Sequence, residues 1–228
     1  MINTRKAEKM IGYLFLIAMF SSLFGGGMME EIATEQNILK YISTNIIKIN
    51  LGVFFEIVNA LCVVGIAVLL YQFLYRINKT SASAYIGFRI IESIFCLTAA
   101  FIPLIIGISG TNYLNSGSPV TSEIKILANA VLNIRSVIAG FYIPVFFCLG
   151  AFVFYYLLFQ SKLLPRFISV WGFLGAALIL ILNLIDVEET VKMVLALPII
   201  LNEIFLGFWL IIKGFDTQIL NSLFETKN

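Results

Sequence analysis

The chain has 228 residues, of which 60% are hydrophobic and only 12% are charged, whereas an average soluble domain is roughly half apolar and about a quarter charged. So few charged residues cannot cover the surface of a soluble globule of this size, so the apolar surplus must face lipid. The net charge is only +2, which gives no reason to expect a nucleic-acid partner.

Several chemistries are excluded because their residues are missing. The chain has no histidine, which excludes Ser-His and Cys-His dyads and every histidine-ligated metal site. Its three cysteines (Cys62, Cys96 and Cys148) are far apart in apolar runs, so no redox pair or thiolate metal site is indicated. Its two aspartates fall at or beyond helix ends, which excludes a paired-aspartate intramembrane protease. We therefore expect no catalytic residues, no metal and no cofactor.

Six stretches approach or exceed the roughly 20 apolar residues that a membrane-spanning helix needs. They are residues 10–28, 49–75, 84–109, 126–159, 163–185 and 191–212. We predict an all-α integral membrane protein in which residues 1–228 form a single transmembrane domain, a bundle of six helices. The first stretch looks like a secretory signal, but we interpret it as an uncleaved first helix. The fourth is long enough to tilt, or to kink at Gly140 and Pro144.

The loops between these spans carry an alternating charge bias. Nine cations fall on one side: Arg5, Lys6, Lys9, Arg76, Lys79, Lys162, Arg166, Lys213 and Lys227. The other side carries four: Lys40, Lys48, Lys125 and Lys192. Because cytoplasmic loops are enriched in Lys and Arg, we expect both termini to lie in the cytoplasm.

Two connecting segments have helical amphipathic spacing. In residues 31–49 the apolar positions are Ile32, Leu39, Ile42 and Ile46, and in the tail they are Ile219, Leu220, Leu223 and Phe224. Each segment is either a packed connector or a helix that binds a partner or the membrane surface. Sequence alone leaves both interpretations open, although the packed connector is the simpler one.

Five ionisable residues fall in the interior of the predicted spans, away from their ends: Glu56, Arg89, Glu92, Arg135 and Glu203. Each costs about 2.5 to 3.5 kcal/mol near the bilayer centre on insertion scales. We therefore expect these residues to be paired, protonated or hydrated inside the bundle.

The third span contains the strongest candidate for a binding site. Helical spacing places four polar side chains on one face of it: Tyr85, Arg89, Glu92 and Ser93. Counted from the cytoplasmic ends of their helices, Glu92 lies about 12 Å deep, and Glu203, which follows Asn202 on the last span, lies about 14 Å deep. One guanidinium cannot fully compensate two buried carboxylates, so this cluster is predicted to hold a proton or a cation.

A second candidate lies in the outer half of the bundle. Glu56 and Asn59 share a face of the second span, and Arg135 reaches a similar depth on the fourth. We predict an outer charge pair between Glu56 and Arg135, whose simplest role is to fix helix register. Asn129, Asn133, Ser136, Gly140 and Pro144 form a polar stripe along the fourth span. Arg135 points away from this stripe, so either protein surrounds that helix or Arg135 extends outward to the headgroups.

Several segments resemble one known family. The segments are Phe88–Glu92, Gln160–Arg166, Asn202–Ile204 and Trp209–Phe215. They are similar to the bacterial integral-membrane family called domain of unknown function 4386, over essentially the whole chain from Ala7 to Phe215. The resemblance implies a multi-pass protein of a bacterial cytoplasmic membrane, and it supplies no catalytic residue, substrate or cofactor.

Three functions are compatible with these patterns. The first is binding or transport of a small, cationic or amphipathic ligand at the inner Arg/Glu cluster. The second is an accessory or structural role through partner contacts, in which case the cluster should be closed, paired and dry. The third is an intramembrane lipid-modifying enzyme, for which no metal-binding or nucleophile motif appears. The expected partners are the lipid bilayer, a small-molecule or lipid ligand and, since six spans often need a second copy to build a pathway, a homodimer.

Overall fold

The computed structural model describes residues 4–33, 38–115, 121–185 and 187–225, and these residues contain helices and no strand. The elements are α1 (Thr4–Ala33), α2 (Ile38–Thr44), α3 (Ile46–Ile77), α4 (Lys79–Asn115), α5 (Ser122–Val137), the π-helical η1 (Ile138–Tyr142), α6 (Ile143–Ser161), α7 (Arg166–Leu184), α8 (Glu189–Ile212) and α9 (Thr217–Glu225).

Six helices in the described ranges are long and apolar enough to cross a membrane, which confirms the predicted number of spans. They are residues 4–32, 46–77, 79–108, 122–161, 166–184 and 190–212. Most are longer than the predicted stretches because the helical backbone continues into polar flanking residues, which an apolar count leaves out. The first helix, for example, begins at Thr4 and includes Arg5, Lys6 and Lys9.

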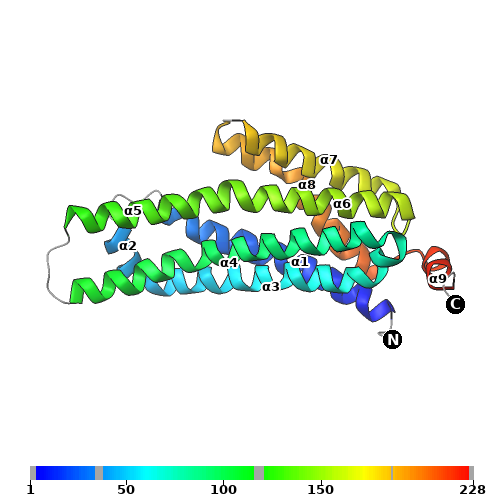
Figure 1. The fold of residues 1–228 in the computed structure, drawn as a ribbon, viewed down its shortest axis with the longest axis horizontal. Helices are drawn as coiled ribbons and strands as arrows, with labels where there is room; N and C mark the ends of the chain where they lie inside the picture. The colour runs from blue at the N-terminus through cyan, green and yellow to red at the C-terminus, as the bar shows by residue number, and fades with distance from the viewer. Residues whose placement is uncertain (1–3, 34–37, 116–120, 186, 226–228) are drawn as a thin grey trace.

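The spans pack as a closed ring. Each contacts its neighbours in the order α1, α3, α4, α6, α7 and α8, and α8 packs against α1 again. Glycine allows α1 and α8 to approach closely, since a Cβ at Gly12 of α1 would lie 2.6 Å from the carbonyl oxygen of Gly207 in α8. The beginning of α1 and the tail helix α9 lie at the same end of the bundle (Figure 1).

The helix formed by α5, η1 and α6 is longer than one membrane crossing requires. Its 40 residues correspond to about 60 Å, against about 28 Å for the 19 residues of α7. A 60 Å helix would have to tilt by about 60° to fit a 30 Å hydrocarbon layer, which exceeds the usual range of tilts. Part of α5 must therefore lie beyond the hydrocarbon, where it extends past α7 and α8 together with α4 (Figure 1).

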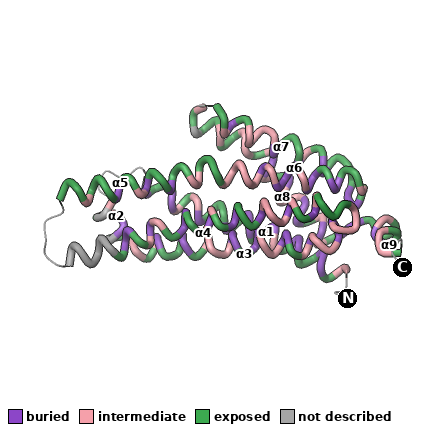
Figure 2. The backbone as a smooth tube through the Cα atoms, in the orientation of Figure 1, coloured by how far each residue is buried: buried purple, intermediate pink, exposed green. Residues whose placement is uncertain are grey.

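The described residues form two apolar cores, one among the spans and one at the end where α4 and α5 extend beyond α7 and α8. The larger lies among the six spans, around residues such as Phe73, Phe154 and Leu206. The smaller lies at the extended end and joins Met29, Ile42 and further residues of α1 to α5. Figure 2 shows buried positions on the inward sides of the helices and a mostly exposed α5.

Both predicted amphipathic segments contain a packed helix. In the first, α2 buries Ile42 completely, in the same apolar core as Ile32 at the end of α1; residues 34–37 and the side chain of Leu39 lie outside the described part. In the second, α9 packs its Phe224 ring edge-on against Phe73 of α3, with centroids 6.4 Å apart. The packed-connector interpretation therefore accounts for the apolar faces of both helices.

Candidate functional site

A cavity of about 260 Å³ lies in the middle of the ring and is lined by residues of all six spans. Its polar lining consists of Ser22, Asn59, Arg89, Glu92 and Glu203, and much of the rest is apolar or aromatic. Because Arg89 and Glu92 come from α4 and Glu203 comes from α8, the helices that face each other across the ring supply the charges. The structure thus brings the three residues of the predicted inner cluster to one cavity.

Arg89 and Glu92 form a buried ion pair. Nη1 of Arg89 donates to Oε2 of Glu92 at 2.6 Å, and each side chain is only 5% exposed. The two residues are one helical turn apart, the spacing at which side chains of one helix face meet. Gly150 of α6 provides the room, since a Cβ there would lie 3.2 Å from Cδ of Arg89.

The rest of the Arg89 guanidinium is surrounded by aromatic rings. Its Cζ atom lies 5.3 Å from the ring centroid of Phe147 and 5.7 Å from that of Tyr85, distances typical of cation–π contacts. Tyr85 in turn stacks on Phe154 at 5.5 Å. The buried Nε of Arg89 has no hydrogen-bond partner among the described residues, so this guanidinium retains an unused donor in the site.

Glu203 is the second acidic group of the cavity. Its carboxylate forms no ion pair within 4 Å in the described part of the chain, and its side chain is partly exposed. Asn202, the residue before it, is fully buried and ties three helices together: it accepts from the Tyr155 hydroxyl at 2.6 Å and donates to the carbonyl oxygen of Ile168 at 3.0 Å. Asn202 therefore fixes the turn of α8 that presents Glu203, and does not itself line the cavity.

Ser93 bonds to a neighbouring helix, and Asn59 lines the central cavity. Ser93 donates to the carbonyl oxygen of Ala60 at 3.1 Å and so joins α4 to α3. Asn59, which we had grouped with Glu56, lines the central cavity with Arg89 and Glu92. Asn59 lines the cavity because of the direction in which its side chain leaves α3. That direction depends on how α3 is rotated against its neighbours.

Glu56 and Arg135 both lie inside the bundle, but no ion pair within 4 Å joins them in the described residues. Glu56 packs against Gly25 of α1, where a Cβ would lie 3.1 Å from the carboxylate. Arg135 is buried although Ile134 and Val137 beside it are more than half exposed. Arg135 therefore faces protein, while the helix that carries it is not surrounded by protein.

The apolar residues that line the cavity were not predicted from the sequence. Phe15 and Met19 of α1, and Phe147 and Pro144 of α6, all line the cavity. Pro144 follows η1, and π-helical segments often occur at functional sites. Gly140 and Pro144 indicated an irregular helix at this position. The aromatic residues could not be predicted to line the cavity, because residues of the same types also face lipid.

Comparison with known families shows to which family the chain is related. A model of the domain of unknown function DUF4386 matches residues 10–214. The chain belongs to the DUF4386 family. No curated protein and no solved structure matches it.

The DUF4386 match contains the whole candidate site. All the cavity-lining residues, from Phe15 to Glu203, lie between residues 10 and 214. The tail helix α9 lies outside the match. Among the described residues, no three His, Cys, Asp or Glu side chains come together in a way that could hold a metal ion.

Proposed function

We propose that this DUF4386 protein binds a small amphipathic cation in the central cavity, with Glu203 as the main counter-charge. The observation that carries the proposal is the position of Glu203: its carboxylate lines a cavity at the centre of six spans and has no ion-pair partner among the described residues.

The charges of the cavity favour a cation. With all three groups ionised, Arg89, Glu92 and Glu203 sum to −1, and the Arg89 charge is already paired with Glu92 at 2.6 Å. A carboxylate without a partner is costly inside a membrane span, where the surrounding dielectric is low. A bound cation, or a proton when the cavity is empty, would remove this cost.

The size and the lining of the cavity favour a small and partly apolar ligand. Its volume of about 260 Å³ is below the roughly 300–1,000 Å³ of pockets that take drug-sized molecules. Phe15, Phe147 and Ile199 offer apolar surface around the charges. A primary or quaternary amine that carries one ring or a short alkyl chain fits this description.

Transport is the activity that the position of the site favours. The cavity is formed near the middle of the spans, where transporters place their substrate sites, and Pro198 lies inside α8 close to Ala196 and Ile199 of the lining. The proposed setting is the cytoplasmic membrane of a bacterium, with both termini inside, as the distribution of Lys and Arg predicts.

Titration of the purified protein with benzyltrimethylammonium tests the proposal. We expect saturable binding to the unaltered protein, much weaker binding of the uncharged analogue benzyl alcohol, and at least a tenfold loss of affinity for the cation in Glu203→Gln, because a charge-assisted contact contributes about 1.5–3 kcal/mol. Glu225→Gln is the matched control, since it removes the same charge from an exposed position on α9.

The alternatives predict other results. For an accessory protein, Glu203→Gln should leave binding of the cation unchanged or there should be no saturable binding, and either result contradicts the proposal. Equal affinity for benzyl alcohol and the cation would also contradict the proposal, because the site would then recognise only the apolar ring. Such a preference is what the lipid-modifying enzyme predicts.

A further inference from the structure

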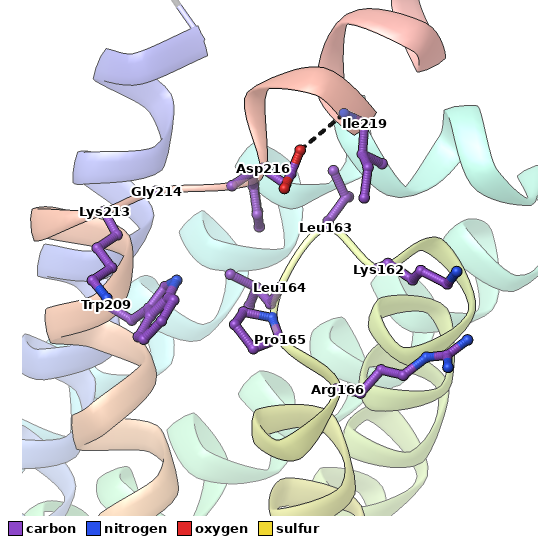
Figure 3. Close-up of a pocket in the computed structure, with 11 residues that line it drawn as sticks. Lys162, Leu163, Leu164, Pro165, Arg166, Trp209, Lys213, Gly214, Asp216 and Ile219 are labelled. Atoms are coloured by element: carbon purple, nitrogen blue, oxygen red, sulfur yellow. Dashed lines mark hydrogen bonds between the residues drawn. The ribbon is translucent and has the colours of Figure 1, made fainter.

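A larger cleft of about 580 Å³ opens at the end of the bundle where α1 begins and α9 lies. It is formed by the turn between α6 and α7 on one side and by the link between α8 and α9 on the other (Figure 3). The floor is apolar and includes Leu164, Pro165, Trp209 and Phe215. The central cavity and this cleft share no lining residue.

Three cations stand around the cleft. Lys213 lies on the α8 side, with Nζ 4.3 Å from the ring centroid of Trp209, while Lys162 and Arg166 extend from the α6–α7 turn on the other side (Figure 3). The one acid of the lining, Asp216, uses Oδ1 to accept from the backbone N–H groups of Gln218 and Ile219 at 3.0 and 3.1 Å. The cleft therefore has a positive balance, and its carboxylate is engaged in capping α9.

The backbone around the cleft is held in place. Lys162 ends α6 in a left-handed conformation with φ of 60°, and the N–H of Asp216 donates to the carbonyl oxygen of Leu163 at 2.9 Å. This hydrogen bond joins the two sides of the cleft. Gly214 supplies the sharp bend after α8 with φ of 79°. The backbone positions of the three cations are thus fixed, while their long side chains are flexible and can turn toward a ligand.

An apolar groove begins directly below Arg166. The groove has a volume of about 220 Å³ and runs along the seam of α6 and α7, between residues such as Tyr156, Phe159, Val170 and Phe173. The Arg166 guanidinium lies 5.0 Å from the ring centroid of Phe159, at the upper edge of this groove. Tyr155 is buried at the base of the groove, whereas the other large side chains of its lining are about half exposed on the outside of the bundle.

We propose that the cleft and the groove together bind one anionic phospholipid of the surrounding leaflet. Its phosphate would lie against Lys162 and Arg166, with Lys213 adding positive charge on the opposite side of the cleft, and one acyl chain would lie in the groove between α6 and α7. A phosphate group alone would use only the cations, whereas a lipid explains why the cationic rim and an apolar groove adjoin at Arg166 and Phe159. Basic pockets between spans at the cytoplasmic side are suited to such headgroups.

Native mass spectrometry of the full chain tests the site. The protein is equilibrated in mixed micelles that contain equal amounts of dioleoyl phosphatidylglycerol and dioleoyl phosphatidylcholine. We expect the retained lipid to be enriched at least tenfold in phosphatidylglycerol. The variant K162N/R166Q should lose most of this enrichment; asparagine is chosen at position 162 because it tolerates a left-handed backbone.

The control variant K6Q/K9Q removes two cations from exposed positions at the same end of the bundle and should keep the enrichment. Equal retention of the two lipids by the unaltered protein would overturn the proposal, as would an equal loss in both double variants. Displacement of phosphatidylglycerol by excess inorganic phosphate would overturn the lipid assignment, because the cleft would then select a free anion. If K162N/R166Q fails to fold, the single variant Lys213→Gln carries the same expectation of reduced enrichment.

Discussion

Glu203 lies across the ring from Arg89, but the guanidinium is already joined to Glu92 at 2.6 Å on its own helix. The cavity between these helices therefore contains one ion pair within α4 and one carboxylate that has no ion pair in the described part of the chain. Glu92 is therefore held by Arg89 of its own helix, whereas Glu203 is the carboxylate that the proposed function assigns to a ligand. The two carboxylates can be tested by different measurements.

Glu92→Gln should destabilise the protein strongly. The substitution leaves the Arg89 guanidinium buried without its partner, and breaking one member of a buried pair costs about 3–5 kcal/mol. The double variant R89M/E92M should be more stable than Glu92→Gln, because neither charge then remains buried. Reversible unfolding in mixed micelles measures both, and Glu123→Gln, at an exposed acid of α5, is the control. A loss no greater than that of the control would show that the pair is not needed for stability.

Substitution of two glycines should change stability in opposite directions. A Cβ at Gly172 of α7 would run into the ring of Tyr155, so Gly172→Ala should cost about 1–3 kcal/mol by overpacking and disturb the hydrogen bond from Tyr155 to Asn202. A Cβ at Gly87 of α4 would meet nothing within 4 Å, so Gly87→Ala should raise stability by up to about 1 kcal/mol through helix propensity. Melting temperatures measured in detergent check both, and a loss of stability in Gly87→Ala would contradict the packing described.

Arg5 should stabilise the end of α8. Its guanidinium donates to the carbonyl oxygens of Leu210, Ile211 and Ile212 at 3.0, 2.8 and 2.8 Å, which are among the carbonyls that a helix end leaves unpaired. Because the side chain is 38% exposed, we expect Arg5→Ala to cost only about 1–2 kcal/mol.

Hydrogen exchange at the link that follows α8 locates this effect. Arg5→Ala should speed exchange at the N–H groups of Lys213 and Gly214, which both donate to the Trp209 carbonyl oxygen. Lys6→Ala, which removes an exposed cation from the next position, should change neither exchange nor stability. Equal effects of the two substitutions would mean that charge at this end matters, and not the three hydrogen bonds.

The sequence predicted those features that follow from one helix at a time. The number of spans follows from the length of apolar stretches, and the contact between Arg89 and Glu92 follows from their spacing of three residues. Glu92 and Glu203, which the helical rise places at a similar counted depth, line one cavity. Each of these predictions needs only the geometry of an isolated helix and the thickness of a bilayer.

Features that depend on the packing of one helix against another could not be predicted. Lipid is as apolar as a protein core, so composition does not separate the inward side from the lipid-facing side of a span. For this reason Asn59 was grouped with Glu56, and Phe15 and Phe147 were not recognised as part of the cavity. The role of Asn202 depends on Tyr155 and Ile168, which come from two other helices.

The orientation of the bundle remains a prediction that reporter fusions can test. Green fluorescent protein fused to the C-terminus should fluoresce, and alkaline phosphatase should be active when fused after Glu188 but inactive at the C-terminus. The physical reason is that nine of the thirteen Lys and Arg residues in the loops and near the ends of the spans belong to the end where α1 begins and α9 lies, and such residues are retained in the cytoplasm. The opposite pattern of phosphatase activity would reverse the orientation. It would also place the cationic cleft at Lys162 and Arg166 against the outer leaflet, so this measurement decides which leaflet supplies the proposed phospholipid.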